Sequence, residues 1–487
     1  MVQMALVDGS YEARSIIASA QRCVNLYPEE NQLNKTLAFP AQMTNSIITH
    51  YPTPGLTLLA TIGTGPIRCT YAANNGVLYV VSGAGVYAVN SAWQATQIGS
   101  IAYGTTPVYM ADNSLQIALV DGTVNGYTIT LATNAFAIIN DPSFYGADGV
   151  DYIDTYLYFN KPGTPQFYST YSEQIVPFDG LYFANKTGYA DNLVRAVTMH
   201  REIWLIGEVS TEIWYDAGNS NFPFAEVPGS FIQHGCLAKY SVAVQDLSIF
   251  WLSQSLQGQR VVVMGANYAV DRISTHAIEA AIQQYAVVSD AEGYIYQQEG
   301  HQFYVLNFPT ANKTWVYDIQ TKLWHERMWR NPADSSENRI RARCAANIYE
   351  KVVCGDWQNG NLYYFDVNNY TDNGVPIERI RSFPTMQNEL KRILYTKFIA
   401  DMQVGSDTSG AGESNPALEV GLRYSDAGGQ SWSDIMYQTN GAGGDFQTNM
   451  QWRRLGMGRR RVFELRWSGA YPTALNGAYI DVLPSAS

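Results

Sequence analysis

Residues 301–328 read HQFYVLNFPTANKTWVYDIQTKLWHERM, and this stretch decides the fold class. Turn formers separate three runs of alternating apolar and polar residues, at 302–308, 314–318 and 323–328. Such runs predict three short β-strands joined in one antiparallel meander. The first run, which we expect to be an inner strand, is apolar at nearly every position, and the second ends in Tyr317 and Asp318 before a tight turn and Trp324. Both features are typical of a β-propeller blade.

A single blade cannot bury both of its faces, so the sequence should hold several such units. Seven units pair an apolar strand with a second, aromatic-rich strand across a polar turn, at 77–89, 116–131, 156–171, 202–215, 248–264, 302–318 and 351–366. Their starts recur at roughly 40 to 50 residues, the period of four-stranded blades. A pair of β-sandwiches would also give recurring hairpins, but so many in series exceed one sandwich. We therefore expect an all-β fold with a propeller of six or seven blades.

The composition agrees with an all-β chain that is long enough for two or three domains. The 487 residues include 34 Tyr, 18 Phe, 11 Trp and 40 Gly, while charged residues make up only 15%. Aromatic residues favour strands and glycines favour tight turns. The formal net charge of −12 argues against a generic nucleic-acid binder, because such proteins depend on Lys and Arg contacts to phosphates.

Shifts in composition divide the chain into three parts. Residues 1–60 predict an extended N-terminal arm, and residues 61–388 carry the propeller hairpins. One helix at 277–285, capped by Ser274 or Thr275, interrupts the hairpins. Residues 389–487 predict a jelly-roll-like C-terminal β-sandwich. Within it, a stretch near 405–416 is rich in Gly, Ser, Asp and Glu, which predicts a flexible surface loop.

The sequence contains few motifs that carry chemistry. Its five cysteines are an odd number without a C-x-x-C pair, which predicts free thiols and no structural zinc. The six histidines form no H-x-x-x-H pair, and no G-x-S-x-G elbow, P-loop or dinucleotide fingerprint is present. Neither a secretory leader nor an apolar run long enough to span a bilayer is evident. We therefore expect no catalytic, cofactor-binding or metal-binding residues.

Several short segments resemble one known family, in the same order along most of the chain. They are NLYPE at 25–29, PGL at 54–56, EIWY at 212–215, IST at 273–275, LRYSDAGGQSW at 422–432, WRRLG at 452–456 and RRRVFELRW at 459–467. Together they are similar to the tail hub, or nozzle, family of packaged-DNA stabilisation proteins from short-tailed bacteriophages (podoviruses).

This resemblance implies a structural protein of the virion rather than an enzyme. Members of the family are expected to assemble in the host bacterial cytoplasm as a homohexamer below the portal and its head-to-tail adaptor ring. The ring would extend the channel for double-stranded DNA, without sequence-specific contact, and would help to retain the packaged genome and support its ejection. The expected partners are a plug or needle protein and a tailspike or tail fibres. No catalytic residues define the family.

Two groups of arginines are candidates for subunit or partner contact. Arg453, Arg454, Arg459, Arg460 and Arg461 surround the turn at 456–458. Alternation places Arg339, Arg341 and Arg343 on one side of a strand. Guanidinium groups in such an array suit carboxylates of a neighbouring subunit. Contact with DNA phosphates, or a solvated face paired within the chain, are the alternatives.

The alternative function is a propeller-type glycan-binding protein or glycoside hydrolase of a phage tail. The stretch SDAGGQSW at 425–432 is similar to the Asp-box turn of sialidases, although it occurs once and its spacing is one residue longer. Asp148, Asp151 and Asp154 offer carboxylates for sugar cleavage. Most tryptophans are expected to fill the cores of blades, and Trp329 is the best candidate for an exposed stacking platform. Another head-to-tail or tail-fibre connector is the alternative within the structural class.

Overall fold

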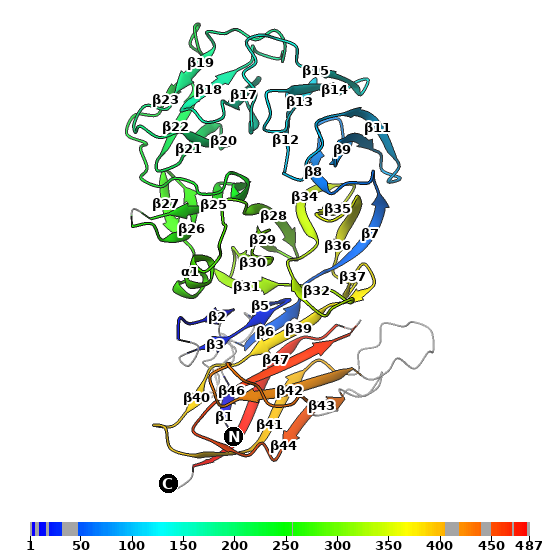
Figure 1. Cartoon of the computed structure of the whole chain (residues 1–487), viewed down its shortest axis with the longest axis vertical. Coiled ribbons are helices and arrows are strands. Elements are labelled where there is room, and N and C mark those ends of the chain that lie inside the picture. Colours follow the sequence, from blue (N-terminus) through cyan, green and yellow to red (C-terminus); the bar gives the residue numbers. More distant parts are fainter. Residues whose placement is uncertain are drawn as a thin grey trace.

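The computed structural model describes residues 2–4, 9–15, 19–31, 47–255, 257–404, 418–439, 450–469 and 472–484 (Figure 1). Within these ranges the chain is almost entirely β-structure, as the composition predicts. The loop expected near 405–416 lies outside the described residues. In the described part of the chain no helix has the length and apolar character needed to cross a bilayer.

Five consecutive four-stranded antiparallel meanders form the first five blades of a propeller. The first three blades are β8 (Ile67–Ala72), β9 (Leu78–Ser82), β10 (Gly85–Val89) and β11 (Ala95–Ser100); β12 (Tyr109–Asp112), β13 (Gln116–Val120), β14 (Gly126–Thr130) and β15 (Ala135–Ile138); β16 (Val150–Ile153), β17 (Tyr156–Asn160), β18 (Gln166–Ser169) and β19 (Phe183–Asn185). The next two are β20 (Leu193–Met199), β21 (Glu202–Gly207), β22 (Thr211–Asp216) and β23 (Phe224–Glu226); β24 (Ala243–Gln245), β25 (Ser248–Gln254), β26 (Arg260–Ala266) and β27 (Ala269–Arg272).

The stretch at 301–328 forms three strands of the sixth blade. This blade consists of β28 (Glu292–Gln298), β29 (His301–Phe308), β30 (Lys313–Asp318) and β31 (Leu323–Arg327). The apolar strand β29 is the second strand of the blade and pairs on both sides, with β28 and β30, as expected for an inner strand. The innermost strand is β28, which contacts β24 and β34 of the neighbouring blades. β29 is apolar throughout because neighbouring blades cover both of its faces, leaving seven of its eight residues buried.

The seventh blade combines strands from distant parts of the chain and closes the ring. It consists of β34 (Ala342–Ile348), β35 (Lys351–Asp356), β36 (Asn361–Asp366) and, as its outer strand, β7 (Gly55–Thr61). β7 pairs antiparallel with β36, and β34 packs against β8 of the first blade. Figure 1 shows the first and last blades side by side. The predicted count of six or seven blades therefore resolves to seven.

Side chains from facing strands form the cores between blades. Trp204 and Trp251 lie fully buried between the fourth and fifth blades, as expected for core-filling tryptophans. Gly265 on β26 faces both rings, and a Cβ atom there would lie 2.9 Å from each of them. The helix α1 (His276–Gln283) covers β26. Its predicted cap is confirmed at Thr275, whose side chain accepts a hydrogen bond from the amide of Ile278.

The C-terminal β-sandwich has two sheets that both include strands from the N-terminal part of the chain. One sheet consists of β44 (Met450–Arg453), β41 (Ile393–Met402), β47 (Leu475–Pro484), β6 (Ile47–Pro52) and β5 (Leu26–Asn31), with β1 (Val2–Met4) on β47 and β45 (Met457–Gly458) on β41. The other consists of β39 (Glu378–Ser382), β46 (Arg460–Ser468), β42 (Glu419–Ser425) and β43 (Met436–Thr439), with β40 (Met386–Gln387) on β46. Phe398 packs between the sheets, with its ring 5.3 Å from Phe463 and 5.8 Å from Trp452.

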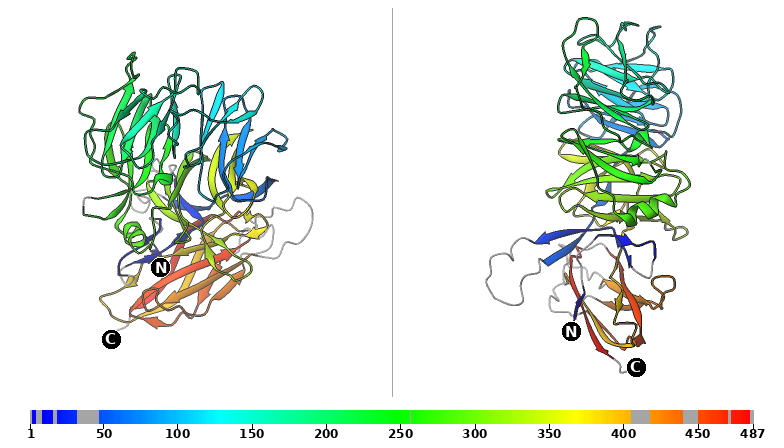
Figure 2. Two further views of the ribbon diagram at one scale, coloured as in Figure 1. Left: turned by 45° about the horizontal axis from the view of Figure 1, so that its top comes forward. Right: turned by 90° about the vertical axis from the view of Figure 1, so that its left-hand side faces the viewer.

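The two domains share one continuous sheet through a two-residue strand. β4 (Cys23–Val24) pairs in parallel with β31 of the sixth blade and antiparallel with β39 of the sandwich. The blade and the sandwich sheet are thereby joined by backbone pairing. Figure 2 shows blue N-terminal strands between the two domains. The remaining short elements are β2 (Tyr11–Glu12), β3 (Ala20–Gln21), β32 (Trp329–Arg330), β33 (Glu337–Asn338), β37 (Thr371–Asp372), β38 (Val375–Pro376) and the 3-10 turn η2 (Lys239–Ser241).

Candidate functional site

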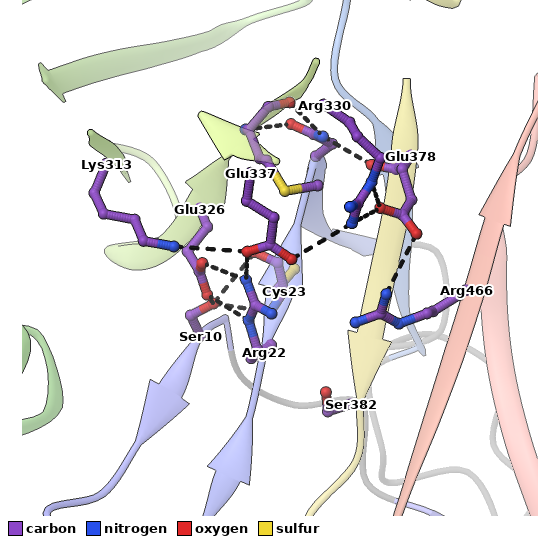
Figure 3. A network of polar contacts seen from close by, with 12 residues as sticks. Ser10, Arg22, Cys23, Lys313, Glu326, Arg330, Glu337, Glu378, Ser382 and Arg466 are labelled. Carbon is purple, nitrogen blue, oxygen red and sulfur yellow. Dashed lines mark hydrogen bonds and ion pairs between the residues drawn. The ribbon is translucent and has the colours of Figure 1, made fainter. Parts of the chain in front are cut away.

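A network of ion pairs surrounds β4 where the propeller meets the sandwich (Figure 3). Arg22 lies 2.9 Å from a carboxylate oxygen of Glu326 and 3.4 Å from one of Glu337. Glu337 also lies within 3.6 Å of Lys313 and 3.5 Å of Arg330. Burial alone would raise the pKa of Glu337, but the charges of Arg22, Lys313 and Arg330 outweigh it and hold this pKa below its usual value. Glu337 is therefore ionised and shared by three cations.

The network continues into the sandwich as a chain of alternating charges. Arg330 donates from its Nε atom to Glu378 at 2.6 Å, and Arg466 reaches the other oxygen of Glu378 at 3.4 Å. Glu464, which is almost fully buried, accepts from both Arg466 and Arg423 at 2.6 Å. Removing one charge from such a network leaves its neighbours buried and uncompensated. We use the term joint for strand β4 together with the ion pairs described in this paragraph and the preceding one.

Side chains close the propeller across its own axis. Tyr109 on β12 of the second blade stacks on Tyr240 of η2, with ring centres 6.1 Å apart, and η2 precedes the fifth blade. Lys239 of the same turn lies 2.8 Å from Asp148, which precedes the third blade. The guanidinium of Arg195, from the fourth blade, lies 3.6 Å from the centre of the Tyr109 ring. These blades are not neighbours in the ring, so their contacts cross its centre.

Arg339, Arg341 and Arg343 lie inside the propeller and pair within the chain. Arg339 and Arg343 are each about 6% exposed, and both bind Glu292 of β28. Arg343 also donates to the carbonyl of Thr105 at 2.7 Å. Arg341 binds Asp356, at 2.7 Å, on the neighbouring strand. The three arginines thus tie the seventh blade to the sixth and to the connection between the first two.

The C-terminal arginines divide into a buried member and exposed ones. Arg461 is only 1% exposed and binds both carboxylate oxygens of Asp426, at 2.6 and 2.7 Å. Its guanidinium also lies 3.8 Å from the centre of the Tyr424 ring. Asp426 belongs to the turn that is similar to an Asp box, and here it anchors Arg461. Exposed side chains belong to Arg453, Arg454 and Arg459, while Arg460 is half-buried.

The residues considered for glycan chemistry are engaged elsewhere. Trp329 is only 7% exposed and lies under Arg341, so the expectation of an exposed stacking platform is wrong. Asp148 pairs with Lys239, as described above. Asp151 accepts hydrogen bonds from the amides of Tyr152 and Thr198, and Asp154 pairs with Arg201. Three different sets of partners therefore hold the three carboxylates.

A hollow of about 710 Å³ lies between the N-terminal hairpin β2–β3 and helix α1. Its lining includes Arg14, Arg260, His276 and Glu279. Glu279 is bound by Arg272 and accepts a hydrogen bond from Ser274 at 2.7 Å. Glu279 is the only carboxylate in this lining, so the hollow lacks the acid pair of a glycosidase. Among the described residues, no three His, Cys, Asp or Glu side chains converge to hold a metal ion, and all five cysteines are free.

The joint was missed by sequence reasoning, although one signal was present. β39 reads ERIRS, and Arg379, Arg381 and Ser382 in it are fully buried. Charged residues inside a central strand require partners elsewhere in the fold. The presence of three charged residues, Glu378, Arg379 and Arg381, within one short strand therefore indicated a buried network. Arg381 donates to the carbonyl of Arg22, 359 residues away in the chain, and nothing in the sequence connects the two.

The architecture defines the chain as a seven-bladed propeller fused to a β-sandwich through a shared sheet. Comparison with known families gives two matches: "Bacteriophage P22 Gp10, beta-propeller" over residues 26–370 and "Bacteriophage P22 Gp10, beta-sandwich" over residues 378–483. The chain belongs to the bacteriophage P22 Gp10 family of stabilisation proteins, which are structural components of the phage tail. Comparison with curated proteins gives no match.

Comparison with solved structures gives matches of low sequence identity. A chain of the mitotic checkpoint complex has 10% identity and a TM-score of 0.42, with coverage of 68% of this chain and 99% of that one. The Pan2 WD40 domain of Neurospora crassa has 8% identity and a TM-score of 0.42, with coverage of 65% and 95%. The WD40 propeller of Doa1 has 10% identity and a TM-score of 0.40, with coverage of 64% and 97%.

Proposed function

We propose that this protein is the nozzle of a short-tailed phage, a homohexameric ring below the portal and its head-to-tail adaptor ring. The observation that carries the proposal is membership of the Gp10 family across both domains. The ring extends the channel through which DNA leaves, helps to retain the packaged genome and acts without catalysis. It offers docking surfaces to a plug or needle protein and to a tailspike or fibres, after assembly in the host bacterial cytoplasm.

The closed propeller axis supports a channel formed between copies. The contacts of Tyr109 with Tyr240 and of Lys239 with Asp148 span the centre of the propeller. Duplex DNA, whose major groove alone is about 12 Å wide, does not fit through a centre filled in this way. The DNA path therefore runs beside the propeller, along surfaces that several copies present together.

The charge of the chain fits a channel that does not grip DNA. Each copy carries a formal charge of −12, so a ring of about six copies carries on the order of seventy negative charges. An acidic lumen repels phosphates and lowers the friction on moving DNA. The joint supports the same role, because a channel wall has to keep its shape while DNA moves past under load.

Mass measurement and imaging of the purified protein test this function. The protein is purified, its mass is measured alone and with candidate adaptor rings, and any oligomer is imaged by cryo-electron microscopy. A closed ring of about six copies with an open channel supports the nozzle. A monomer that does not bind the adaptor ring and instead binds or cleaves surface polysaccharide would contradict the proposal and support the glycan alternative.

A further inference from the structure

An exposed apolar row crosses one end of the sandwich. Leu394 of β41 is the register partner of Met457 on β45 and of Leu483 on β47. Partners on antiparallel strands direct their side chains to the same face of a sheet. Met457 is 47% exposed and Leu483 is 57% exposed, so the row is open to solvent. Leu483 is next to the C-terminal end of β47, which lies at the end of the sandwich farthest from the propeller (Figure 2).

Cationic side chains surround this row. Arg453 ends β44 opposite Lys397, three residues along β41 from Leu394, and it is exposed. Arg459 donates to the carbonyl of Leu390 at 2.8 Å, which holds it beside the exposed Lys391 and Arg392. The exposed Arg454 belongs to the turn that follows β44. We define the apolar row and these cations, with Arg460, as the sandwich tip.

The sandwich tip is far more basic than the rest of the molecule. Its six cations are accompanied by the carboxylate of Glu389, which pairs with Lys391 on the surface. The neighbouring Lys397 and Asp481 form an ion pair of 3.2 Å and add no net charge. The tip thus carries a formal charge of +5 in a chain of −12, so the remainder carries −17. In the described part of the chain, Arg392 and Arg454 have no hydrogen-bond or ion-pair partner for their side chains. A charge separation of this size within one chain favours contact between copies.

We propose that the sandwich tip docks on an acidic surface of a second copy of this chain, an inference that rests on the proposed ring. An exposed apolar centre with a charged rim is the usual anatomy of a protein interface. DNA phosphates would bind the arginines but would leave the apolar row in water. Contact between the tip of one copy and a different surface of the next is heterologous, and heterologous contacts generate rings when the rotation between copies closes.

The opposite end of the same sandwich offers carboxylates for this contact. β41 begins beside the tip at Ile393 and ends at Met402, and the exposed Asp401 lies at that far end. Ten residues of strand span roughly 33 Å, so Asp401 is too distant to pair with the tip of its own copy. The exposed Glu419 at the start of β42 adds a second carboxylate from the other sheet.

Charge reversal tests the contact. The tip variant replaces Arg453, Arg454 and Arg459 with Glu, and it spares the buried Arg461. A matched control makes the same charge change at the exposed Arg14, Arg201 and Lys322, which lie elsewhere. Sedimentation velocity over a range of protein and salt concentrations measures self-association, and circular dichroism confirms folding. We expect the tip variant to self-associate at least about tenfold more weakly than wild type, with the control unchanged. Equal weakening of both variants, or of neither, overturns the proposal.

Two further measurements separate this inference from the nozzle itself. Anisotropy of labelled duplex DNA reports whether the tip binds nucleic acid, and lost DNA binding with normal assembly would overturn the docking. If wild type is monomeric alone, cryo-imaging of tails decides. A ring in which each tip touches the next copy supports the inference. A ring whose tips face solvent or the adaptor overturns it while the nozzle stands, and tails that hold this protein without a ring overturn both.

Discussion

Arg22 and Glu326 form an ion pair, 2.9 Å long, between the N-terminal segment and the sixth blade. The pair lies beside β4, the only strand that pairs with both the propeller and the sandwich sheet among the described residues. Glu326 also accepts a hydrogen bond from Ser10, so two parts of the N-terminal segment meet at one carboxylate. The N-terminal segment thus links the two domains, beside the direct contact of Arg330 with Glu378.

Replacing Arg22 with Ala should weaken the joint. Glu326 would remain mostly buried without its cation, and breaking such a pair costs about 3 kcal/mol. Urea unfolding followed by tryptophan fluorescence measures the loss. The control is Lys391→Ala, because Lys391 pairs with Glu389 on the surface, where ion pairs contribute little. A double-mutant cycle with Glu326→Gln should show coupling, and additive effects would contradict the role of this pair.

Closure of the propeller should depend on the buried part of β7. Leu56 is 1% exposed and packs in the core around the seventh blade, so Leu56→Ala should cost about 2–5 kcal/mol. Leu58 on the same strand is 43% exposed, so Leu58→Ala is the matched control. Hydrogen exchange should quicken at the amides of β36 in the first variant alone. Unchanged exchange there would mean that β7 does not hold the blade closed.

Acid should destabilise the protein through His325. This imidazole is fully buried, and burial lowers its pKa to about 3. The unfolded chain binds a proton near pH 6.5 and the folded one does not, so stability is lost as pH falls from 6.5 towards 3. The slope contributed by one such group is about 1.4 kcal/mol per pH unit. His325→Phe should flatten the difference between pH 7 and pH 5, whereas His276→Asn, at an exposed histidine, should not. Parallel curves for wild type and His325→Phe would refute this assignment.

The buried Arg461 should be intolerant of lysine. Its planar guanidinium binds both oxygens of Asp426 while stacking on Tyr424, and an ammonium group reproduces neither contact. We expect Arg461→Lys to lower the melting temperature of the sandwich clearly in calorimetry. The exposed Arg459 provides the control, and Arg459→Lys should melt like wild type. Similar melting of both variants would show that the bidentate pair contributes little.

Most of the fold could be predicted from the sequence because the pattern of a blade is set by residues that are neighbours in the chain. Seven hairpin units were visible between residues 77 and 366, and all seven lie in blades. The count stayed open because β7 carries no signal that assigns it to a blade 300 residues later. Likewise, the burial of Trp329 depends on Arg341 above it, which strand patterning does not show.

The candidate contact residues show the same limit of prediction from sequence. The positions of the arginines were plain in the sequence, but their partners were not. Arg343 meets Glu292 and Arg461 meets Asp426 because strands from different hairpins become neighbours. Arg453 and Arg459 have local patterns of the same kind, yet they are exposed. A charged residue on a strand has the same local signature whether a carboxylate or water faces it.

The sequence alone determined that the chain is a propeller followed by a sandwich and that it resembles the phage nozzle family, because period, turn chemistry and short motifs are properties of neighbouring residues. Only the tertiary structure decided the number of blades, the closed propeller axis, the joint and the exposed sandwich tip. These features arise where residues far apart in the chain are packed together. Burial and partner choice are fixed there by packing, not by local propensity.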